Sequence, residues 1–155
     1  MESNAEASRR IGDDASRQEV LKVHQGYVAA SIACDADLLA QVWDPDPSDV
    51  HFALSGHTYQ GLAHLQQIYG YYRPQLEIDV PCEAFDEDVE VADDVAWVTC
   101  SRFGSTRWVG QTPPPLADGP QLYRSTEIMV RGAGGWQVVH SHFSPISQEP
   151  RPGDI

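Results

Sequence analysis

Apolar and polar positions follow a helical period in the first half of the chain. Between residues 16 and 33, apolar or aromatic side chains recur every three or four positions, at Val20, Val23, Tyr27, Val28 and Ile32. This spacing places them on one face of a helix, and the acidic pair Asp13 and Asp14 supplies a favourable start. We therefore predict an amphipathic helix over residues 16–33.

Two further helices and a short strand are predicted before residue 75. Residues 35–42 form a second helix, which the Asp-Pro-Asp-Pro sequence at 44–47 ends because a residue before proline avoids helical angles. Residues 50–54 have the composition of a strand, and a glycine-bracketed turn follows it at 56–61. A third helical face carries Leu62, Leu65, Tyr69 and Tyr72. Pro74 ends this helix.

Beyond residue 75 the helical period gives way to the two-residue alternation of β-strands. Strands are predicted at about 76–85, 95–103, 122–131 and 136–143, separated by an acidic turn, a proline-rich loop and the sequence Gly-Ala-Gly-Gly. Helices followed by strands are typical of an α+β domain with helices on one face of an antiparallel sheet. We assign residues 15–145 to this domain, residues 1–14 to a disordered N-terminal segment and residues 146–155 to a surface tail.

Charge and cysteine content narrow the classes of partner. The chain has 23 acidic and 10 basic residues and a formal net charge of −13, with no lysine or arginine cluster that could follow a phosphate backbone or an anionic membrane. Nucleic acid and membrane partners are therefore not expected. Three cysteines without a Cys-x-x-Cys spacing indicate neither a disulfide framework nor a zinc site. No signal-peptide core or membrane span is recognisable, so we expect a cytoplasmic protein.

Strand alternation predicts a polar end on an otherwise apolar sheet face. The inward residues of the last three strands would be Ala96, Val98, Cys100 and Arg102, then Tyr123, Ser125, Glu127 and Met129, and finally Trp136, Val138, His140 and His142. Neighbouring strands lie about 4.7 Å apart, so Arg102, Glu127 and one of the two histidines are expected to converge. Desolvation disfavours a carboxylate charge and arginine favours it, and this opposition tunes a general acid or base. A buried ion pair that only orders the sheet agrees equally well with the sequence.

The two histidines, His140 and His142, allow three interpretations: proton transfer, half of a metal site, or a structural pair. The spacing resembles the His-x-His of cupins, but the position of the cupin glutamate holds Ile146, and Glu149 lies in the proline-rich tail. A metal site completed by Glu127 or His51 has weak support because no ligand spacing is fixed. No metal is therefore predicted, and no nucleotide-binding or acyl-enzyme motif is found.

Aromatic side chains come from every element expected to cover the sheet. They are Tyr27, Trp43, Tyr59, Tyr69 and Tyr72. Most are expected to be ordinary core residues. Rings with hydroxyl or indole tips around one cavity would also suit a flat, partly polar ligand, because the rings stack while the tips form directional hydrogen bonds. Tyr59, with His51 and His57 nearby, is the phenol that we expect to contact a substrate.

The chain resembles the nuclear transport factor 2-like superfamily, especially its SnoaL-like branch and the association (hub) domain of calcium/calmodulin-dependent protein kinase. The similarity rests on residues 94–102, on Thr126 placed ten residues before Trp136, and on residues 136–144. It covers roughly residues 16–145. The resemblance implies a cone-shaped roll of about three N-terminal helices on a curved, mainly antiparallel sheet, usually dimeric through the outer face of the sheet.

The resemblance does not settle the chemistry, because similar cones serve as dehydratases, isomerases, cyclases, epoxide hydrolases and binding or assembly modules. In the hub domain, arginines occupy the positions of both Arg102 and Glu127. The opposite charge of Glu127 here means that the anion-binding role of the hub cannot be transferred intact.

We therefore predict a cofactor-independent acid–base lyase or isomerase. It would catalyse elimination, isomerisation or retro-aldol (deformylating) cleavage of a small hydrophobic, aromatic molecule that is lignin-derived or polyketide-like. The expected catalytic residues are Arg102, Glu127, His142 and Tyr59; the expected substrate-binding residues are Tyr27, Trp43, His51, Tyr69, Tyr123 and His140. A homodimer through the sheet is expected, with no cofactor. The alternative is a non-catalytic small-molecule-binding or assembly module.

Overall fold

The computed structural model describes residues 11–114, 118–147 and 153. Its helices are α1 (Asp14–Ala33), α2 (Ala36–Val42) and α3 (Leu62–Tyr72), with a 3-10 turn η1 (Arg73–Gln75) after α3. Its strands are β1 (Val50–Phe52), β2 (Thr58–Gln60), β3 (Leu76–Ala92), β4 (Val95–Trp108), β5 (Gly119–Gly132) and β6 (Gly135–Pro145). Most of the predicted N-terminal segment 1–14, and most of the predicted tail 146–155, lie outside the described residues.

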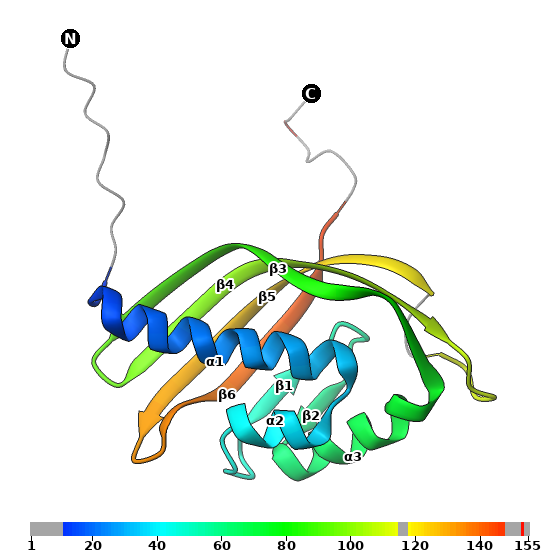
Figure 1. The fold of residues 1–155 in the computed structure, drawn as a ribbon, viewed down its shortest axis with the longest axis horizontal. Helices are drawn as coiled ribbons and strands as arrows, with labels where there is room; N and C mark the ends of the chain where they lie inside the picture. The colour runs from blue at the N-terminus through cyan, green and yellow to red at the C-terminus, as the bar shows by residue number, and fades with distance from the viewer. Residues whose placement is uncertain (1–10, 115–117, 148–152, 154–155) are drawn as a thin grey trace.

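The strands form one six-stranded sheet in the order β2-β1-β6-β5-β4-β3. Strand β1 runs parallel to β6, and the other neighbours are antiparallel. The sheet is curved, and all three helices lie on its concave side (Figure 1). This arrangement confirms the predicted α+β fold with helices on one face of a mainly antiparallel sheet. No helix in the described part of the chain has the length and apolar content needed to cross a membrane.

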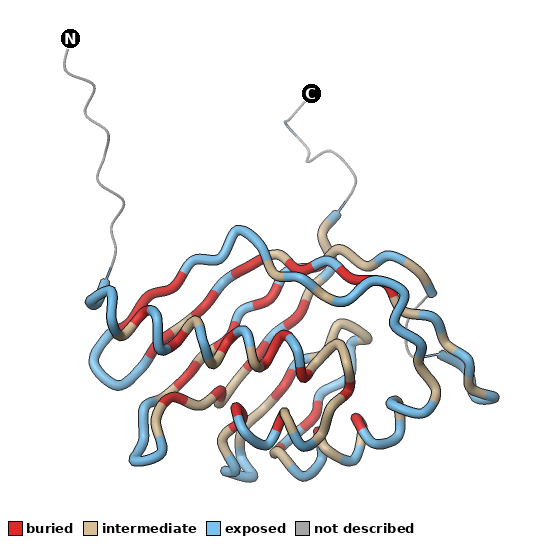
Figure 2. Tube along the Cα trace, viewed as in Figure 1, coloured by how far each residue is buried: buried red, intermediate tan, exposed pale blue. Residues whose placement is uncertain are grey.

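Helix α1 crosses the sheet and buries the face predicted from its period. Its N-cap is Asp13, whose side chain accepts a hydrogen bond from the backbone N–H of Ser16 at 2.7 Å. This bond satisfies one of the free donors of the first turn and stabilises the start of the helix. Val20, His24 and Tyr27 are fully buried against the sheet, and Figure 2 shows this buried stripe along the helix.

Strand β3 is longer than predicted. The acidic run at 86–90 was expected to form a solvated turn, but it continues the strand to Ala92, and the turn to β4 lies at Asp93 and Asp94. Register shifts interrupt the pairing with β4, including one between Phe85 and Asp88. Asp86 and Asp88 are exposed, whereas Glu90 is buried and Glu87 lies beside His24. Val89, within this run, and Val91, directly after it, are buried, which explains why pairing persists.

Strand β6 contains a bulge that reverses its faces. Ile128 of β5 pairs with His140, whereas Met129 pairs with Val138, so Val139 is an extra residue. One inserted residue moves every later side chain to the opposite face. The prediction that Trp136, Val138, His140 and His142 share one face is therefore wrong: the first two are buried under the helices, and so are Ser141 and Phe143.

The two strand histidines lie on the outer face of the sheet instead. His142 is exposed and His140 is half-buried. Both rings flank Phe52 of β1, with centroid distances of 5.2 Å for His140 and 5.4 Å for His142. The Nδ1 atom of His140 lies 2.8 Å from the backbone oxygen of Val50. Neither imidazole can reach the concave side of the sheet in this register.

Replacing Gly61 with alanine is expected to lower the free energy of unfolding by about 1–3 kcal/mol. Gly61 precedes α3 with φ +80° and ψ 154°, a region almost restricted to glycine, and a Cβ atom would lie 3.2 Å from the Cα and O atoms of Pro47. Gly70 within α3 is the control, because a Cβ atom there meets nothing within 4 Å. Urea unfolding should show a small gain for Gly70→Ala; equal effects of both substitutions would contradict this interpretation.

Candidate functional site

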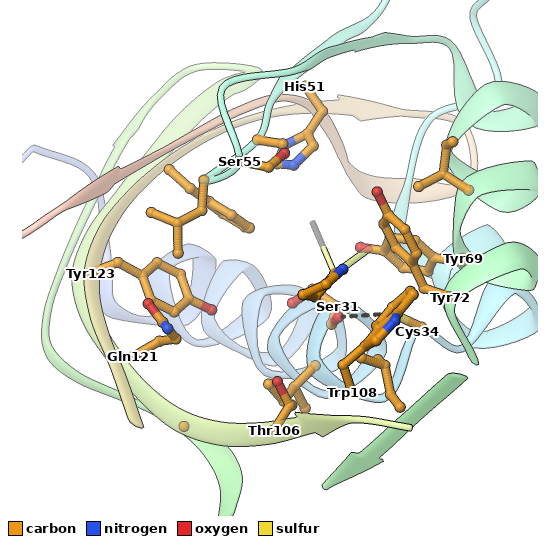
Figure 3. Close-up of a pocket in the computed structure, with 18 of the residues that line it drawn as sticks. Ser31, Cys34, His51, Ser55, Tyr69, Tyr72, Thr106, Trp108, Gln121 and Tyr123 are labelled. Carbon is orange, nitrogen blue, oxygen red and sulfur yellow. Dashed lines mark hydrogen bonds between the residues drawn. The ribbon is translucent and has the colours of Figure 1, made fainter. Parts of the chain in front are cut away.

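A cavity of about 180 Å³ opens between the helices and the concave face of the sheet. Residues from the end of α1, the β1 region, α3, β4, β5 and β6 line it, so every layer of the fold contributes (Figure 3). Its polar lining groups include Ser31, His51, Tyr59, Tyr72 and Tyr123. Among the described lining residues, only Asp118, which is exposed, has an acidic side chain. A neutral interior of this kind favours a neutral ligand.

Aromatic rings form much of the cavity wall. The hydroxyls of Tyr59 and Tyr72 lie 3.5 Å apart, and the Tyr72 ring meets Trp108 edge-on at 5.8 Å. On the sheet side, the rings of Tyr123 and Phe143 are 5.4 Å apart. Burial raises the pKa of Tyr69, Tyr72 and Tyr123, so these phenols stay protonated at neutral pH. The wall can therefore stack on a flat ring and donate hydrogen bonds at its edges.

A buried charge network lies on the sheet beneath α1. The Glu127 carboxylate accepts hydrogen bonds from Arg102, from Ser125 Oγ at 3.2 Å and from His24 Nδ1 at 2.6 Å. The side chains of Arg102, Glu127 and His24 are fully buried. The second ring nitrogen of His24 lies 3.1 Å from Glu87. The expected convergence of Arg102 with Glu127 is confirmed, but the histidine that joins them is His24 rather than His140 or His142.

His24 is protonated in this network. Burial alone lowers the pKa of His24, but contacts with Cys100 and with the Glu127 carboxylate outweigh it and raise the pKa to about 10. The sequence prediction missed this residue. The signal was present, because His24 occupies the same helical stripe as the buried residues Val20 and Tyr27, where a histidine needs a polar partner.

The network touches the cavity through Arg102. Its guanidinium donates a hydrogen bond to Ser31 Oγ, a cavity-lining atom, at 2.9 Å. The same group lies 4.7 Å from the ring centroid of Phe143, which also lines the cavity, and 5.3 Å from that of Tyr27. Glu127 does not border the cavity among its described lining residues. The charge network therefore influences the cavity indirectly, through the contacts of Arg102 with Ser31 and Phe143.

One group of described residues brings three potential metal ligands together. Ligand atoms of His24, Cys100 and Glu127 lie within 4.8 Å of one another. A cation at this point would meet the guanidinium of Arg102 and a protonated His24, and only the carboxylates of Glu127 and the part-exposed Glu87 would compensate. Like charges in a buried site repel strongly, so this cluster suits an ion pair better than a metal.

A second buried chain of polar groups reaches the cavity at His51. His51 Nδ1 lies 2.6 Å from Ser141 Oγ, which lies 2.7 Å from the hydroxyl of Tyr27. His51 is neutral, because burial and the nearby charge of Arg102 lower its pKa to about 3. Strand β1 places His51 beside Ser141 in the parallel register with β6. Ser141 was not predicted, since its inward direction depends on the β6 bulge.

Apart from Arg102 and Glu127 in the charge network, the predicted site residues fall into three groups. Four of them line the cavity, namely His51, Tyr59, Tyr69 and Tyr123. Tyr27 and Trp43 are fully buried in the core and, in the described part of the chain, are not among the lining residues. His140 and His142 lie on the opposite face of the sheet.

Comparisons with known proteins support the fold. A ketosteroid isomerase-like protein from Erwinia carotovora atroseptica superimposes with a TM-score of 0.69 at 17% identity, covering 87% of this chain and 99% of that protein. A nuclear transport factor 2 (NTF2-like) superfamily protein from Salmonella enterica gives 0.66 at 18% identity, with 88% and 94% covered. The CaMKII hub of S. rosetta gives 0.63 at 25% identity, with 84% and 96% covered.

No relative was found among curated protein sequences. Residues 20–148 match the family described as the SnoaL-like domain, which is more than half of the 155-residue chain. The helices, the curved mixed sheet and the solved structures named above agree with this match. The chain therefore belongs to the SnoaL-like domain family of the NTF2-like superfamily.

Proposed function

We propose that this domain is a cofactor-independent acid–base lyase or isomerase acting on a small, hydrophobic, aromatic molecule. The observation that carries this proposal is the apolar aromatic cavity with protonated phenols and a neutral imidazole on its wall. Elimination, isomerisation and retro-aldol cleavage each need protons moved on and off a bound ligand, and such groups can donate and accept them. The isomerase-like neighbour agrees with this class of chemistry. We also place the protein in the cytoplasm, in keeping with its free cysteines.

Within this proposal, each group has a distinct role. Tyr59 contacts the ligand and exchanges a proton through its hydroxyl. Arg102 stabilises negative charge that develops on the ligand, because it lies directly behind Phe143 in a water-poor interior. Glu127 and His24 are positioning residues, since they hold Arg102 without bordering the cavity. His142 has no role, because it is exposed on the outer face.

Filling the cavity should abolish both ligand binding and turnover. Ala53 lines the cavity, and Ala53→Phe would place a ring in the space that the ligand needs. The matched control is Ala63→Phe, an exposed position on α3. A panel of hydroxylated and carbonyl-bearing aromatics would be screened for product formation and for a rise in melting temperature, which a native-state ligand produces. Turnover that survives in Ala53→Phe would show that the chemistry lies elsewhere.

A non-catalytic binding or assembly module is the second candidate. Its support is that Glu127 is sealed in an ion-pair network away from the cavity, so no buried carboxylate faces a ligand among the described lining residues. The hub neighbour at 25% identity adds to this possibility. Ligands that raise the melting temperature of the wild type, without product formation at any pH tested, would favour this candidate over the enzyme.

We further propose that the chain forms a homodimer through the outer face of the sheet. The register places Trp97, Ile128 and His140 in one row across β4, β5 and β6. Phe52 beside His140, and Phe103 six residues further along β4 from Trp97, are each about two-fifths exposed. Apolar surface of this kind marks interaction sites. Ile128→Asp should yield a monomer in analytical ultracentrifugation, whereas Val109→Asp, in the exposed loop after β4, should leave the dimer intact. A dimer that persists in Ile128→Asp would contradict this interface.

A further inference from the structure

The hydrogen bonds between Tyr27, Ser141 and His51 can run in one direction only. The Tyr27 hydroxyl and the Ser141 side chain are fully buried, and His51 is 4% exposed. Among the described residues, the Tyr27 hydroxyl contacts Ser141 Oγ alone, and Ser141 Oγ contacts only Tyr27 and His51. Each hydroxyl has one proton to donate, and a buried donor without an acceptor costs about 1–3 kcal/mol.

Three arrangements of these protons are conceivable, and two leave a buried donor unsatisfied. If His51 Nδ1–H donated to Ser141 and Ser141 donated to Tyr27, the Tyr27 proton would have no acceptor. If Tyr27 and His51 both donated to Ser141, the Ser141 proton would have none. Only the sequence Tyr27 to Ser141 to His51 Nδ1 satisfies every group. Burial raises the pKa of Tyr27, which keeps its proton available for this chain.

This direction fixes the tautomer of His51. Because Nδ1 accepts a hydrogen bond, the single proton of the neutral imidazole must reside on Nε2. The side-chain hydrogen bond to Ser141 is made at Nδ1, and the ring projects from β1 into the cavity (Figure 3). The ring is also held in place, because it stacks on Tyr59 at 6.2 Å and meets Phe143 edge-on at 4.7 Å.

We propose that His51 Nε2–H is a fixed hydrogen-bond donor for a carbonyl or enolate oxygen, so that the cavity selects aromatic ketones and aldehydes over hydrocarbons and amines. A neutral imidazole can polarise a carbonyl in this way without carrying a charge. Its donor points at the ligand before binding, so little reorganisation is needed when negative charge develops on the oxygen. This inference rests on one premise of the proposed function, namely that the cavity is the ligand-binding site.

The tautomer can be measured without any ligand. Long-range ¹H–¹⁵N NMR correlations distinguish a protonated from an unprotonated ring nitrogen, and His51→Asn assigns the signal. We expect wild-type His51 to carry its proton on Nε2 at pH 7. Tyr27→Phe removes the donor to Ser141, so that the Ser141 hydroxyl can either donate to His51 Nδ1 or accept from it. This variant should therefore show a mixture of the two His51 tautomers. His57→Phe, at an exposed position, should leave the His51 signal unchanged. A proton on Nδ1 in the wild-type protein would overturn the proposal.

Ligand selectivity provides the second test, with 1-indanone, indane and 1-aminoindane as probes of nearly equal size. In the wild type, 1-indanone should bind more tightly than indane, and 1-aminoindane should not bind. His51→Phe should reduce the indanone-to-indane affinity ratio by about fivefold, the worth of one neutral hydrogen bond. The same ratio in His57→Phe should match the wild type. A ratio that His51→Phe leaves unchanged, or a wild type that binds indane as well as indanone, would overturn the proposal.

These outcomes separate this inference from the proposed enzyme. The Nε2–H tautomer together with selective ketone binding supports the inference even if no ketone is turned over, a result that would count against catalysis alone. Turnover combined with an Nδ1–H tautomer would leave the enzyme standing and remove His51 as the carbonyl donor.

Discussion

Replacing Glu127 with glutamine is expected to lower the free energy of unfolding by about 3–5 kcal/mol at neutral pH. The substitution keeps the shape of the side chain but removes the one carboxylate between Arg102 and a protonated His24, all of them fully buried. Two positive charges would then remain with only the part-exposed Glu87 beside His24 to compensate them, and one of them would have to be released or rehydrated. Urea unfolding followed by circular dichroism measures the loss.

The matched control is Glu83→Gln, which removes an exposed carboxylate from β3 and should change stability by less than about 0.5 kcal/mol. If Glu127→Gln proves too unstable to purify, Arg102→Met combined with Glu127→Gln should recover part of the loss, because it removes the unpaired guanidinium as well. Equal stability of Glu127→Gln and Glu83→Gln would show that the network does not hold the fold together.

The second large effect concerns pH. The stability contributed by His24 should be fully present below pH 6.5, the ordinary histidine pKa, and should be lost as the pH rises towards about 10, its pKa in the folded protein. In this interval the folded state holds a proton that the unfolded state has released. The free energy of unfolding should therefore fall by up to about 1.4 kcal/mol per pH unit.

The measurement is the difference in unfolding free energy between the wild type and His24→Gln from pH 6 to pH 10. Cys34 also contributes at the alkaline end of this range: burial raises its pKa to about 11, and its contribution to stability falls in the same direction. Because both proteins share this contribution, the difference isolates His24. His57→Gln, at an exposed position, is the control and should follow the wild type. Parallel pH curves for the wild type and His24→Gln would contradict a protonated His24.

Much of the fold could be predicted from the sequence because the apolar periods are strong. The stripe of α1 and the stop at Pro74 are local features, and the structure confirms both. The short strand β2 was missed, since three residues between turns carry too little alternation to identify a strand. The extent of β3 was underestimated because a run of acidic side chains within a strand resembles the composition of a loop.

The site was predictable only where strand alternation is regular. Arg102 and Glu127 lie on β4 and β5, which pair without a register shift, and both residues face inward as expected. Strand β6 has its bulge at Val139, and no residue there marks it, so the inward position of Ser141 could not be derived. His24 depends on contacts between α1 and β5, 103 positions apart in sequence, which alternation within one strand cannot predict.

The most direct test is a crystal structure of the complex with 1-indanone. The ketone oxygen should lie about 2.7–3.2 Å from His51 Nε2, and the ring should contact Tyr59 and Phe143, with Arg102 behind them. A ligand bound instead beside Phe52 and His142 on the outer face, with the cavity between helices and sheet unchanged, would contradict the account.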